Sequence, residues 1–531
     1  MRLLRLHIKR CQSTPGFKNL SDFVIEFDAE SPTTVLVGRN GTGKSNILEA
    51  LTVIFRELEL ESSNPQFAYD LQYTCWGQQI TIDADPDRPS RKVQIAVDGT
   101  AVTSKAFSEN KRKYLPNYVF GYYSGPSNRM QEHFLKHQER FYDELINRSD
   151  KDELPLRPLF FAQHIHSQFV LLAFFLEQDQ EMLKFLDEHL GITGLDSVLF
   201  VMKEPPWKSR EGDPRFWRAR GAVAVLLDRL YRQSLAPMRH SWRVPLGFRK
   251  TTELEHVYLY LPSAEALRDL KSEYTTQQDF FKALESTYIS ELMREVRTRV
   301  KARCSDAPLT FRELSEGEQQ LLMVLGLLRF TREDESLFLL DEPDTHLNPA
   351  WSVQYLEFLK NIGGLGNNGH VIMATHDPLV ISGLTRQQVR VMLRDKPESP
   401  IRAEMPDMDP RGMGVNGLLR SELYGLRSAL DLPTLEKIDE RDAIRAKQKK
   451  LQERGKDLSE KDRLRLIQLS DELSDLGFSR DFRDPIEQQF ADAMTRRRPK
   501  KEQIVLTPQE LKEQEKVADE ILEEILAEEQ K

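Results

Sequence analysis

The chain has 531 residues, of which 39% are hydrophobic and 30% charged, and its formal net charge is −9. This length allows more than one domain, and the negative charge excludes a protein that attracts nucleic acid through its whole surface, so any such contact needs a local basic patch. Cys11, Cys75 and Cys304 stand far apart, which is typical of a reducing compartment and not of a disulfide framework. The N-terminus is too polar for a signal peptide, and the longest apolar run, from Phe169, is about half a membrane span. We therefore expect a soluble, cytoplasmic protein without membrane contact.

The first part of the chain predicts an α/β lobe. Residues 3–10 and 23–29 alternate apolar and polar side chains, as half-buried antiparallel strands do. Residues 33–38, TTVLVG, form a continuous β-branched run that suits a strand buried on both faces. Strand patterns return at 80–102 and 117–125. We assign this lobe to residues 1–130.

A glycine-rich loop, GRNGTGKS at 38–45, follows the buried strand, opens a helix and satisfies the pattern G-x-x-x-x-G-K-[ST]. Such a loop turns backbone N–H groups toward a phosphate, and the helix N-terminus adds a positive dipole. We expect Lys44 to neutralise the β- and γ-phosphates and the Ser45 hydroxyl to ligate Mg²⁺. The residues expected to hold the nucleotide are Gly38, Arg39, Asn40, Gly41, Thr42, Gly43, Lys44, Ser45 and Asn46.

Three further regions follow this lobe. Residues 131–304 have the pattern of a mostly helical insertion, with a loop at 204–221 and a strand entering a helix at 256–270. Residues 305–435 return to α/β patterning with buried strands. Residues 436–531 are charged and helical in pattern, and the final helix carries an apolar stripe at Ile521, Leu522, Ile525 and Leu526. We expect this last region to dock a partner protein.

Two strand ends in the second α/β region carry candidate catalytic groups. Asp341 and Glu342 directly follow an apolar strand, where two acids are costly unless a cation or phosphate lies nearby. We expect Asp341 to hold Mg²⁺ and Glu342, which points the other way, to polarise an attacking water. His376 follows another buried strand, where ligands bind in open α/β sheets. We expect it to sense the γ-phosphate and to hold Glu342 in place.

These pieces, with the turn LSEGE at 314–318, resemble in their order the ATP-binding-cassette (ABC) ATPases, particularly the heads of the SMC and RecF group. The match covers roughly residues 1–130 and 305–395. It implies an ABC head, a mixed sheet with a P-loop and antiparallel N-terminal strands, that uses ATP and Mg²⁺. It also implies that Ser315, Gly317 and Glu318 hold the nucleotide of a second copy, so we expect a homodimer or a higher even-numbered homo-oligomer.

Three sequence details qualify this resemblance. The glutamates at 316 and 318 depart from the commoner LSGGQ wording. Residues 344–348 occupy the place of the loop that links the two nucleotide sites in such dimers. The glutamine that completes Mg²⁺ coordination in the family follows a strand after the first lobe, and Gln131 is the candidate. No residue stands out as the one that stacks on adenine.

A more specific resemblance is to the PtuA family, the ATPase subunits of Septu-type and retron-associated antiphage defence systems. It rests on the compact head, the wording DEPDTHLNP at 341–349, the insertion in place of a long coiled coil, and the charged tail with SRDFRDPIEQQF at 479–490. It implies a regulatory ATPase that assembles with a PtuB-like HNH nuclease, and in retron forms with a reverse transcriptase and its RNA–DNA product. We expect nuclease activity only from the partner, because PDMDP at 406–410 has the pattern of a loop and not of a metal-binding acid pair.

Three other functions stay open at this point. A RecF-like ATPase of DNA repair or recombination would bind DNA and need no nuclease partner. An assembly scaffold would bind ATP with negligible hydrolysis. An ATP-binding subunit of a membrane transporter is disfavoured by the long insertion and the charged tail.

Several other patterns have a structural and a functional interpretation. His133 and His137 have a zinc-ligand spacing but no third ligand, so packed or solvated histidines are favoured. The stretch at 207–220 mixes aromatic residues with arginines, which suits either a loop pinned by its tryptophans or nucleic-acid contact. The basic cluster RRRPKK at 496–501 suits a solvated tail or contact with nucleic acid or an acidic partner.

Overall fold

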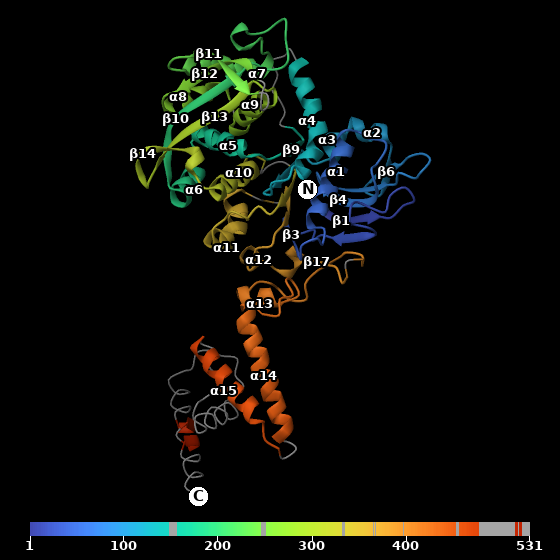
Figure 1. Ribbon diagram of the computed structural model, residues 1–531. Helices are drawn as coiled ribbons and strands as arrows, with labels where there is room; N and C mark the ends of the chain where they lie inside the picture. Colours follow the sequence, from blue (N-terminus) through green and yellow to red (C-terminus); the bar gives the residue numbers. More distant parts are fainter. Residues whose placement is uncertain are drawn as a thin grey trace. The chain divides into compact units, whose positions relative to one another are not determined.

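The structure is a computed structural model and describes residues 1–147, 157–245, 251–274, 276–331, 335–364, 366, 368–396, 398–428, 430–452, 456–476, 516–518 and 520–522. The chain divides into two compact units, Met1–Leu426 and Arg427–Lys531. The first unit contains three β-sheets with helices around them (Figure 1). No described helix is both long and apolar enough to cross a membrane.

The central sheet has seven strands and is parallel except for β18 at one edge. Across the sheet these are β18 (Arg402–Glu404), β17 (Val389–Leu393), β3 (Thr33–Gly38), β16 (Gly369–Ala374), β15 (Ser336–Asp341), β8 (Tyr118–Tyr123) and β9 (Leu159–Phe161). The predicted buried strand at 33–38 is confirmed as β3. Ala374 pairs with Asp341 on one side and with Leu36 on the other, so the carboxyl ends of β15, β16 and β3 meet at one edge.

The N-terminal sheet has six antiparallel strands. In order these are β2 (Phe23–Glu26), β1 (Arg2–Lys9), β4 (Ala68–Cys75), β5 (Gln78–Ala84), β6 (Val93–Val97) and β7 (Thr100–Val102). Helix α1 (Lys44–Glu59) shares one apolar core with both sheets: Leu6 and Leu71 come from the N-terminal sheet, Leu51 from α1 and Ile372 from the central sheet. The antiparallel N-terminal strands expected from the sequence are confirmed.

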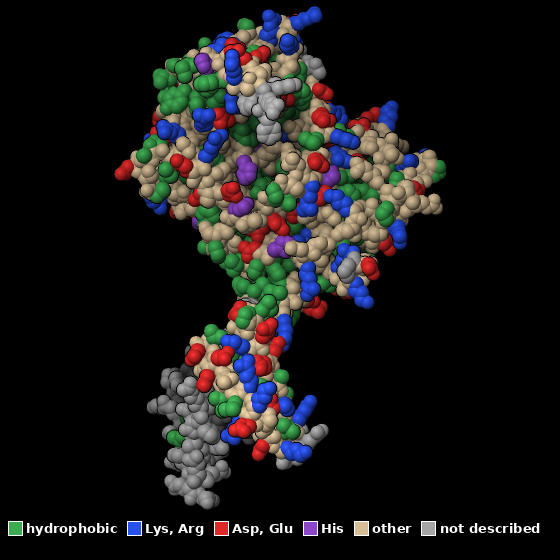
Figure 2. Space-filling model, in the orientation of Figure 1, with side chains coloured by type: hydrophobic (Ala, Val, Ile, Leu, Met, Phe, Trp, Pro, Cys, Tyr) green, Lys and Arg blue, Asp and Glu red, His purple; other side chains and the backbone are tan. Residues whose placement is uncertain are grey.

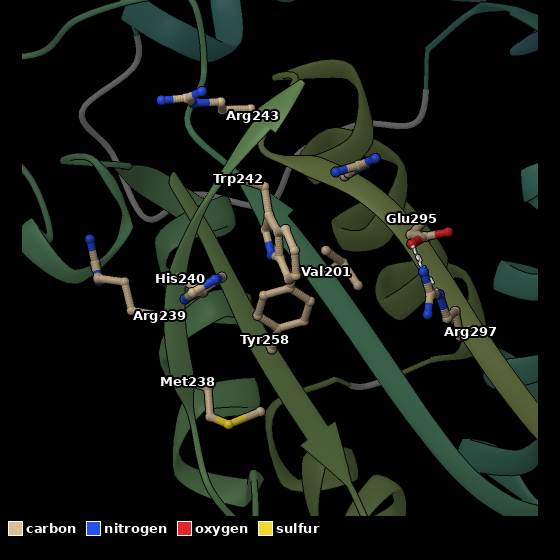
Figure 3. A pocket seen from close by; sticks show the side chains of 10 residues that line it. Val201, Met238, Arg239, His240, Trp242, Arg243, Tyr258, Glu295 and Arg297 are labelled. Carbon is tan, nitrogen blue, oxygen red and sulfur yellow. Dashed lines mark hydrogen bonds and ion pairs between the residues drawn. The ribbon is translucent and has the colours of Figure 1, made fainter. Parts of the chain in front are cut away.

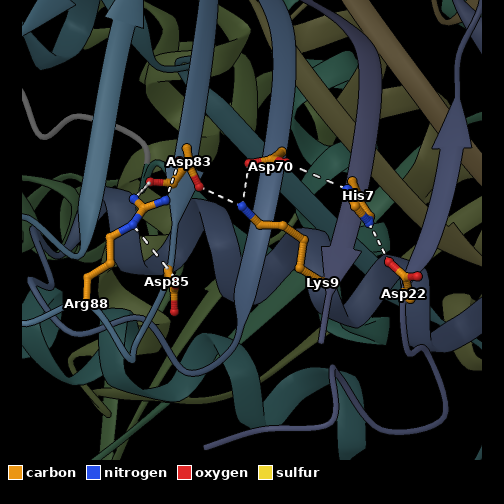
Figure 4. A network of polar contacts seen from close by, with 7 residues as sticks. All are labelled: His7, Lys9, Asp22, Asp70, Asp83, Asp85 and Arg88. Carbon is orange, nitrogen blue, oxygen red and sulfur yellow. Dashed lines mark hydrogen bonds and ion pairs between the residues drawn. The ribbon is translucent and has the colours of Figure 1, made fainter. Parts of the chain in front are cut away.

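The opposite face of the N-terminal sheet carries a ladder of ion pairs (Figure 4). Nζ of Lys9 on β1 lies 2.7 Å from a carboxylate oxygen of Asp70 on β4 and 2.6 Å from one of Asp83 on β5. Arg88 also pairs with Asp83. These pairs raise the pKa of Lys9 against the effect of its partial burial. Cross-strand pairs of this kind help to fix the register of neighbouring strands.

The insertion contains four strands of a five-stranded sheet besides its helices, a sheet that the expectation of a mostly helical region did not include. Its elements are α4 (Arg129–Asn147), α5 (His164–Glu177), α6 (Gln180–Leu190), β10 (Ile192–Lys203), η1 (Pro214–Phe216), α7 (Gly221–Gln233), β11 (Met238–Pro245), β12 (Thr251–Leu261), α8 (Ala264–Arg268), η2 (Asp269–Glu273), α9 (Gln277–Ile289) and β13 (Met293–Ala302). With β14 (Ser305–Thr310), the strands β11-β12-β10-β13-β14 form a five-stranded antiparallel sheet. An apolar run such as SVLFVM in β10 does not distinguish a buried strand from a buried helix, which explains why the sheet was not expected.

The remaining helices of the first unit pack on the two larger sheets, with α2 beside β6 of the N-terminal sheet. They are α2 (Ser104–Glu109), α3 (Lys111–Tyr114), η3 (Phe311–Glu313), α10 (Glu316–Phe330), α11 (Pro349–Glu357), η4 (Phe358–Ile362), α12 (Pro378–Ile381), η5 (Arg386–Gln388) and α13 (Gly414–Arg420). Helices α5 and α10 approach closely, since a Cβ at Gly326 would lie 2.1 Å from a methyl carbon of Val170. The insertion is thus packed directly on the helix that follows the LSEGE turn.

The second unit contains a helical hairpin, α14 (Leu432–Gln452) and α15 (Glu460–Asp475). Ion pairs Lys437–Glu472, Arg465–Glu440 and Lys447–Asp462 join the two helices in antiparallel order. Helical structure in this charged region was expected. The segments SRDFRDPIEQQF and RRRPKK and the last part of the terminal amphipathic helix lie outside the described residues.

Candidate nucleotide-binding site

The glycine loop between β3 and α1 is held in a conformation that other residues disfavour. Gly38, Gly41 and Gly43 have φ angles of 147°, 81° and 87°, and Gly43 is the N-cap of α1. The side-chain amide of Asn19 donates a 3.0 Å hydrogen bond to the carbonyl of Gly41, and its oxygen accepts one of 2.6 Å from Asn46. The loop therefore has a fixed shape before any phosphate binds.

Lys44 is folded back over this loop. Its Nζ donates hydrogen bonds of 2.7 Å to the carbonyl of Gly38 and 3.4 Å to that of Arg39. Burial lowers the pKa of Lys44 to about 8, although the nearby carboxylates of Glu342 and Asp341 act in the opposite direction. A phosphate would replace these carbonyls with a far stronger partner for the ammonium.

Asp341 ends β15 directly beside the glycine loop. It is 3% exposed, and burial raises the pKa of its carboxyl against the hydrogen bond from the Ser45 side chain and the charge of Arg129. Nη2 of Arg129 donates to Oδ2 of Asp341 at 3.2 Å. A serine hydroxyl beside a carboxylate is a donor set that suits Mg²⁺. Ser45 and Asp341, both predicted from the sequence as metal ligands, thus lie together.

Glu342 and His376 meet on the exposed side of the same edge. Nε2 of His376 lies 3.2 Å from Oε1 of Glu342, and this contact lowers the pKa of the Glu342 carboxyl. Glu342 has a φ of 53°, a left-handed conformation that is costly for a residue with a side chain and recurs at functional sites. The hydroxyl of Tyr424 donates to the carbonyl of His376 at 2.9 Å. The sequence prediction that His376 contacts Glu342 agrees with this geometry.

The LSEGE turn begins helix α10 and is closed by a capping box. Oγ of Ser315 accepts from the N–H of Glu318 at 3.3 Å, and the Glu318 carboxylate accepts from the N–H of Ser315 at 2.6 Å. The glutamate that departs from LSGGQ at position 318 thus has a structural role. Ser315 and Glu316 are exposed, whereas Gly317 is buried. A Cβ at position 317 would lie 2.3 Å from the carbonyl oxygen of His346, so only glycine fits there.

The turn makes no hydrogen bond or ion pair with the glycine loop of its own chain, both segments, residues 314–318 and 38–46, being fully described. The nearest ion pair instead joins Glu316 to His346, at 3.4 Å, in the segment that follows Glu342. The structure thus brings Lys44, Ser45, Asp341, Glu342 and His376 together and leaves Ser315, Gly317 and Glu318 outside that group.

Arg129 belongs to the site but was missed in the sequence, and Asp344 was placed only in the loop expected to link the two nucleotide sites. Arg129 opens α4 and contacts Asp341, whereas Gln131, on the same helix, makes no described hydrogen bond to Asp341 or Ser45, so its metal role stays a prediction. Asp344 is 5% exposed, its pKa is raised to about 6 by burial, and it accepts a hydrogen bond from Thr375. A buried acid that needs a cationic partner was the available signal for Arg129.

The other candidates from the sequence have structural roles. His133 bonds Glu49 at 2.9 Å and His137 is buried, so the two do not share a metal. In the 207–220 stretch, the indole N–H of Trp207 donates to the carbonyl of Ser290 at 2.7 Å, and that of Trp217 to Glu255 at 2.9 Å. This stretch is a loop pinned by its tryptophans, as the structural interpretation predicted.

The glycine loop after β3, the capped turn before α10, the acids after β15 and the histidine after β16 occur in the order and positions of an ABC-type ATPase. The fold and the site therefore have the features of an ATPase of this class. Two family models agree with this assignment: "AAA ATPase domain" matches residues 7–186, and "AAA domain, putative AbiEii toxin, Type IV TA system" matches residues 249–382.

Among curated proteins, the chain is similar to the Septu protein PtuA of Bacillus mycoides (strain KBAB4). The two are 30% identical over 156 residues, which is 27% of this chain and 21% of that protein. The matched part thus spans about a fifth of that relative. The similarity to PtuA is limited to this matched part of the chain.

Solved structures give more distant matches. An SMC head bound to the C-winged helix domain of ScpA is 10% identical, with a TM-score of 0.32, over 77% of this chain and 98% of that one. An ATP-binding cassette of an ABC transporter is 10% identical, with a TM-score of 0.28, over 80% and 98%. The class assignment rests on strand order, motif positions and the family models.

Proposed function

We propose that the chain binds ATP with Mg²⁺ between two copies of itself, hydrolyses it slowly, and uses this cycle to control a nuclease partner. One observation carries the first part. Lys44, Asp341, Glu342 and His376 gather at one edge of the central sheet, while the exposed Ser315 turn makes no described hydrogen bond or ion pair with the glycine loop of its own chain. An exposed, pre-formed helix N-terminus of this kind suits the γ-phosphate held by a second copy.

The residues have distinct roles in this proposal. Ser45 and Asp341 would hold Mg²⁺, which supplies charge neutralisation for the β- and γ-phosphates. Lys44 exchanges its loop carbonyls for phosphate oxygens. Glu342 orients and deprotonates the attacking water, and His376, 3.2 Å from its carboxylate, fixes its rotamer. Ser315 of the second copy completes the anion site.

The proposed partner follows from the similarity to a Septu protein. A PtuA-like ATPase in an antiphage system would assemble with a PtuB-like HNH nuclease, and a retron form would add a reverse transcriptase and its RNA–DNA product. We place the docking surface for this partner in residues 436–531, which include most of the charged helix α14 and all of α15. Deleting these residues is expected to abolish co-purification of the nuclease without changing ATP binding. Unchanged nuclease affinity would contradict this placement.

Hydrolysis and assembly are tested together with Glu342→Gln. The variant is expected to release phosphate at least about 100-fold more slowly than the wild type, because the water loses its base, and to accumulate as an ATP-bound dimer in mass photometry. Glu357→Gln, at an exposed position on α11, is the matched control and should behave as the wild type. Equal phosphate release by both variants, or a strictly monomeric Glu342→Gln protein with ATP and Mg²⁺, would refute the proposal.

A further inference from the structure

The five-stranded sheet of the insertion has a solvent-facing surface with two adjoining pockets. One has a volume of about 790 Å³ and the other of about 490 Å³, and Arg297 on β13 lines both. Strand β11 forms the edge of the sheet on the side of the larger pocket. We call the surface lined by these two pockets the insertion-sheet face; Figure 3 views its larger pocket.

Aromatic side chains form one part of this face. His240 and Trp242 stand two residues apart on β11 and so share one face of the sheet, and their rings lie 4.7 Å apart at 73°. Tyr258 on β12 lines the same pocket, so that the three rings gather at one place on the sheet (Figure 3). The Trp242 side chain is 52% exposed, and Met238, in the same pocket, is 62% exposed. Large apolar side chains in water at one place indicate a binding surface.

Arginines form the other part. Six of the residues that line the two pockets are arginines, and Glu295 is the one acid among them. Glu295 pairs with both Arg297 and Arg312, so it does not cancel their combined charge. Arg243 and Arg299 have no ion-pair partner among the described residues. The face is therefore locally positive on a chain whose net charge is −9.

This combination selects the chemistry of the ligand. Arginines attract phosphates, and exposed rings stack on bases, but only where the bases are not already paired with one another. A duplex would present its phosphates and leave the rings of Trp242 and Tyr258 unused. An acidic peptide would pair with the arginines but would likewise leave these rings without a partner. A single strand satisfies both sets of side chains at once.

We infer that the insertion-sheet face binds single-stranded nucleic acid, with its bases stacked on Trp242, Tyr258 and His240. Its phosphates pair with Arg297 and Arg299 on the face and with Arg243 at the β11 edge of the sheet. This activity is separate from ATP hydrolysis and does not depend on the proposed function. In the aromatic and basic stretch at 207–220, which the sequence offered for such contact, the two tryptophans instead anchor the loop to Ser290 and Glu255.

The test measures fluorescence anisotropy of labelled 20-nucleotide single strands of DNA and of RNA, and of the matching DNA duplex, with the full chain. We expect a single strand to bind more tightly than the duplex. Trp242→Ala and Arg243→Glu should each weaken that binding by about tenfold, as the loss of one stacked base or one phosphate contact does. Arg243→Glu should also reduce the salt dependence of binding.

Two matched controls separate local contacts from general effects. Trp76→Ala removes another exposed tryptophan, and Lys105→Glu makes the same charge change at an 87% exposed side chain on α2. Both should bind as the wild type, and thermal unfolding checks that all variants fold. A preference for DNA or for RNA identifies the natural strand. The inference would be overturned if the chain bound no single strand at low salt, bound duplex equally well, or lost as much binding in the control variants. It would also be overturned if Trp242→Ala bound normally and polyglutamate, an acidic peptide, displaced the strand.

Discussion

Arg129, the first residue of α4, donates a 3.2 Å hydrogen bond to Asp341 at the end of β15, although the two are 212 residues apart in sequence. The same guanidinium lies 4.9 Å from the centre of the Tyr123 ring and 3.7 Å from Glu49. Arg129 therefore holds a positive charge next to a buried carboxylate at the position where Mg²⁺ is proposed to bind. The protein without nucleotide has a cation of its own at this carboxylate.

We predict that Arg129→Met lowers the stability of the nucleotide-free protein by about 1 kcal/mol, because Asp341 loses a hydrogen bond from a charged donor. Adding ATP and Mg²⁺ should recover most of this loss, because the metal then compensates the carboxylate. Thermal unfolding with and without nucleotide measures both effects. Arg140→Met, at an exposed position on the same helix, should change neither value. An Arg129 variant whose lower stability persists unchanged with nucleotide would argue against charge compensation.

The pKa of Lys44 makes nucleotide binding sensitive to alkaline pH. Without nucleotide this pKa is about 8, whereas phosphates would raise it in the complex. The protonated form that binds phosphate therefore dominates below about pH 7, makes up half of the protein at pH 8 and is lost above it. We predict that ATP affinity falls by up to about tenfold between pH 8 and 9. Titration with a non-hydrolysable ATP analogue measures this change. Lys44→Arg, which stays protonated, should bind with an affinity that is flat over this range, and an equal slope in both proteins would contradict the explanation.

The sequence predicted those parts of the site that depend on short, continuous stretches of the chain. The glycine loop has a fixed local pattern, and Asp341, Glu342 and His376 each follow a continuous apolar strand. Because parallel strands of one sheet end at a shared edge, these local features were enough to expect the four groups together. The catalytic and binding roles themselves stay predictions until they are measured.

The parts that the sequence did not predict depend on contacts between distant segments. In the sequence, Arg129 does not differ from other basic residues near the start of a helix. Its role becomes visible only when the fold places α4 against β15. The insertion sheet was missed because its central strand, β10, is buried along much of both faces and lacks a clear alternation. Glu318 stands where the LSGGQ motif has glutamine, so the sequence was compared with that motif and the capping role of Glu318 was not recognised.

His137 provides a prediction for stability against pH. This residue on α4 is 6% exposed, and burial together with nearby cationic groups lowers its pKa from 6.5 to about 3. The folded state binds the proton less readily than the unfolded state, so stability is complete above pH 6.5 and is lost as the pH falls toward 3. We predict that His137→Leu reduces the acid-induced decrease in the free energy of unfolding by about 2 kcal/mol at pH 5, as measured by urea unfolding. His164→Leu, at an exposed site, should keep the wild-type slope, and a parallel slope for His137→Leu would contradict the prediction.

Glu318 places a carboxylate where the proposed second copy would present its γ-phosphate. The carboxylate accepts the N–H of Ser315, so it closes the turn but also repels an incoming anion. Glu318→Gln keeps an acceptor for this N–H and removes the charge. In a Glu342→Gln background, which blocks hydrolysis, we predict that it strengthens the ATP-dependent dimer about fivefold, the effect of removing roughly 1 kcal/mol of repulsion. Glu313→Gln alters an equivalent capping box at Thr310 and should leave dimerisation, measured by mass photometry, unchanged. A weaker dimer for Glu318→Gln would mean that the glutamate contributes only by capping α10.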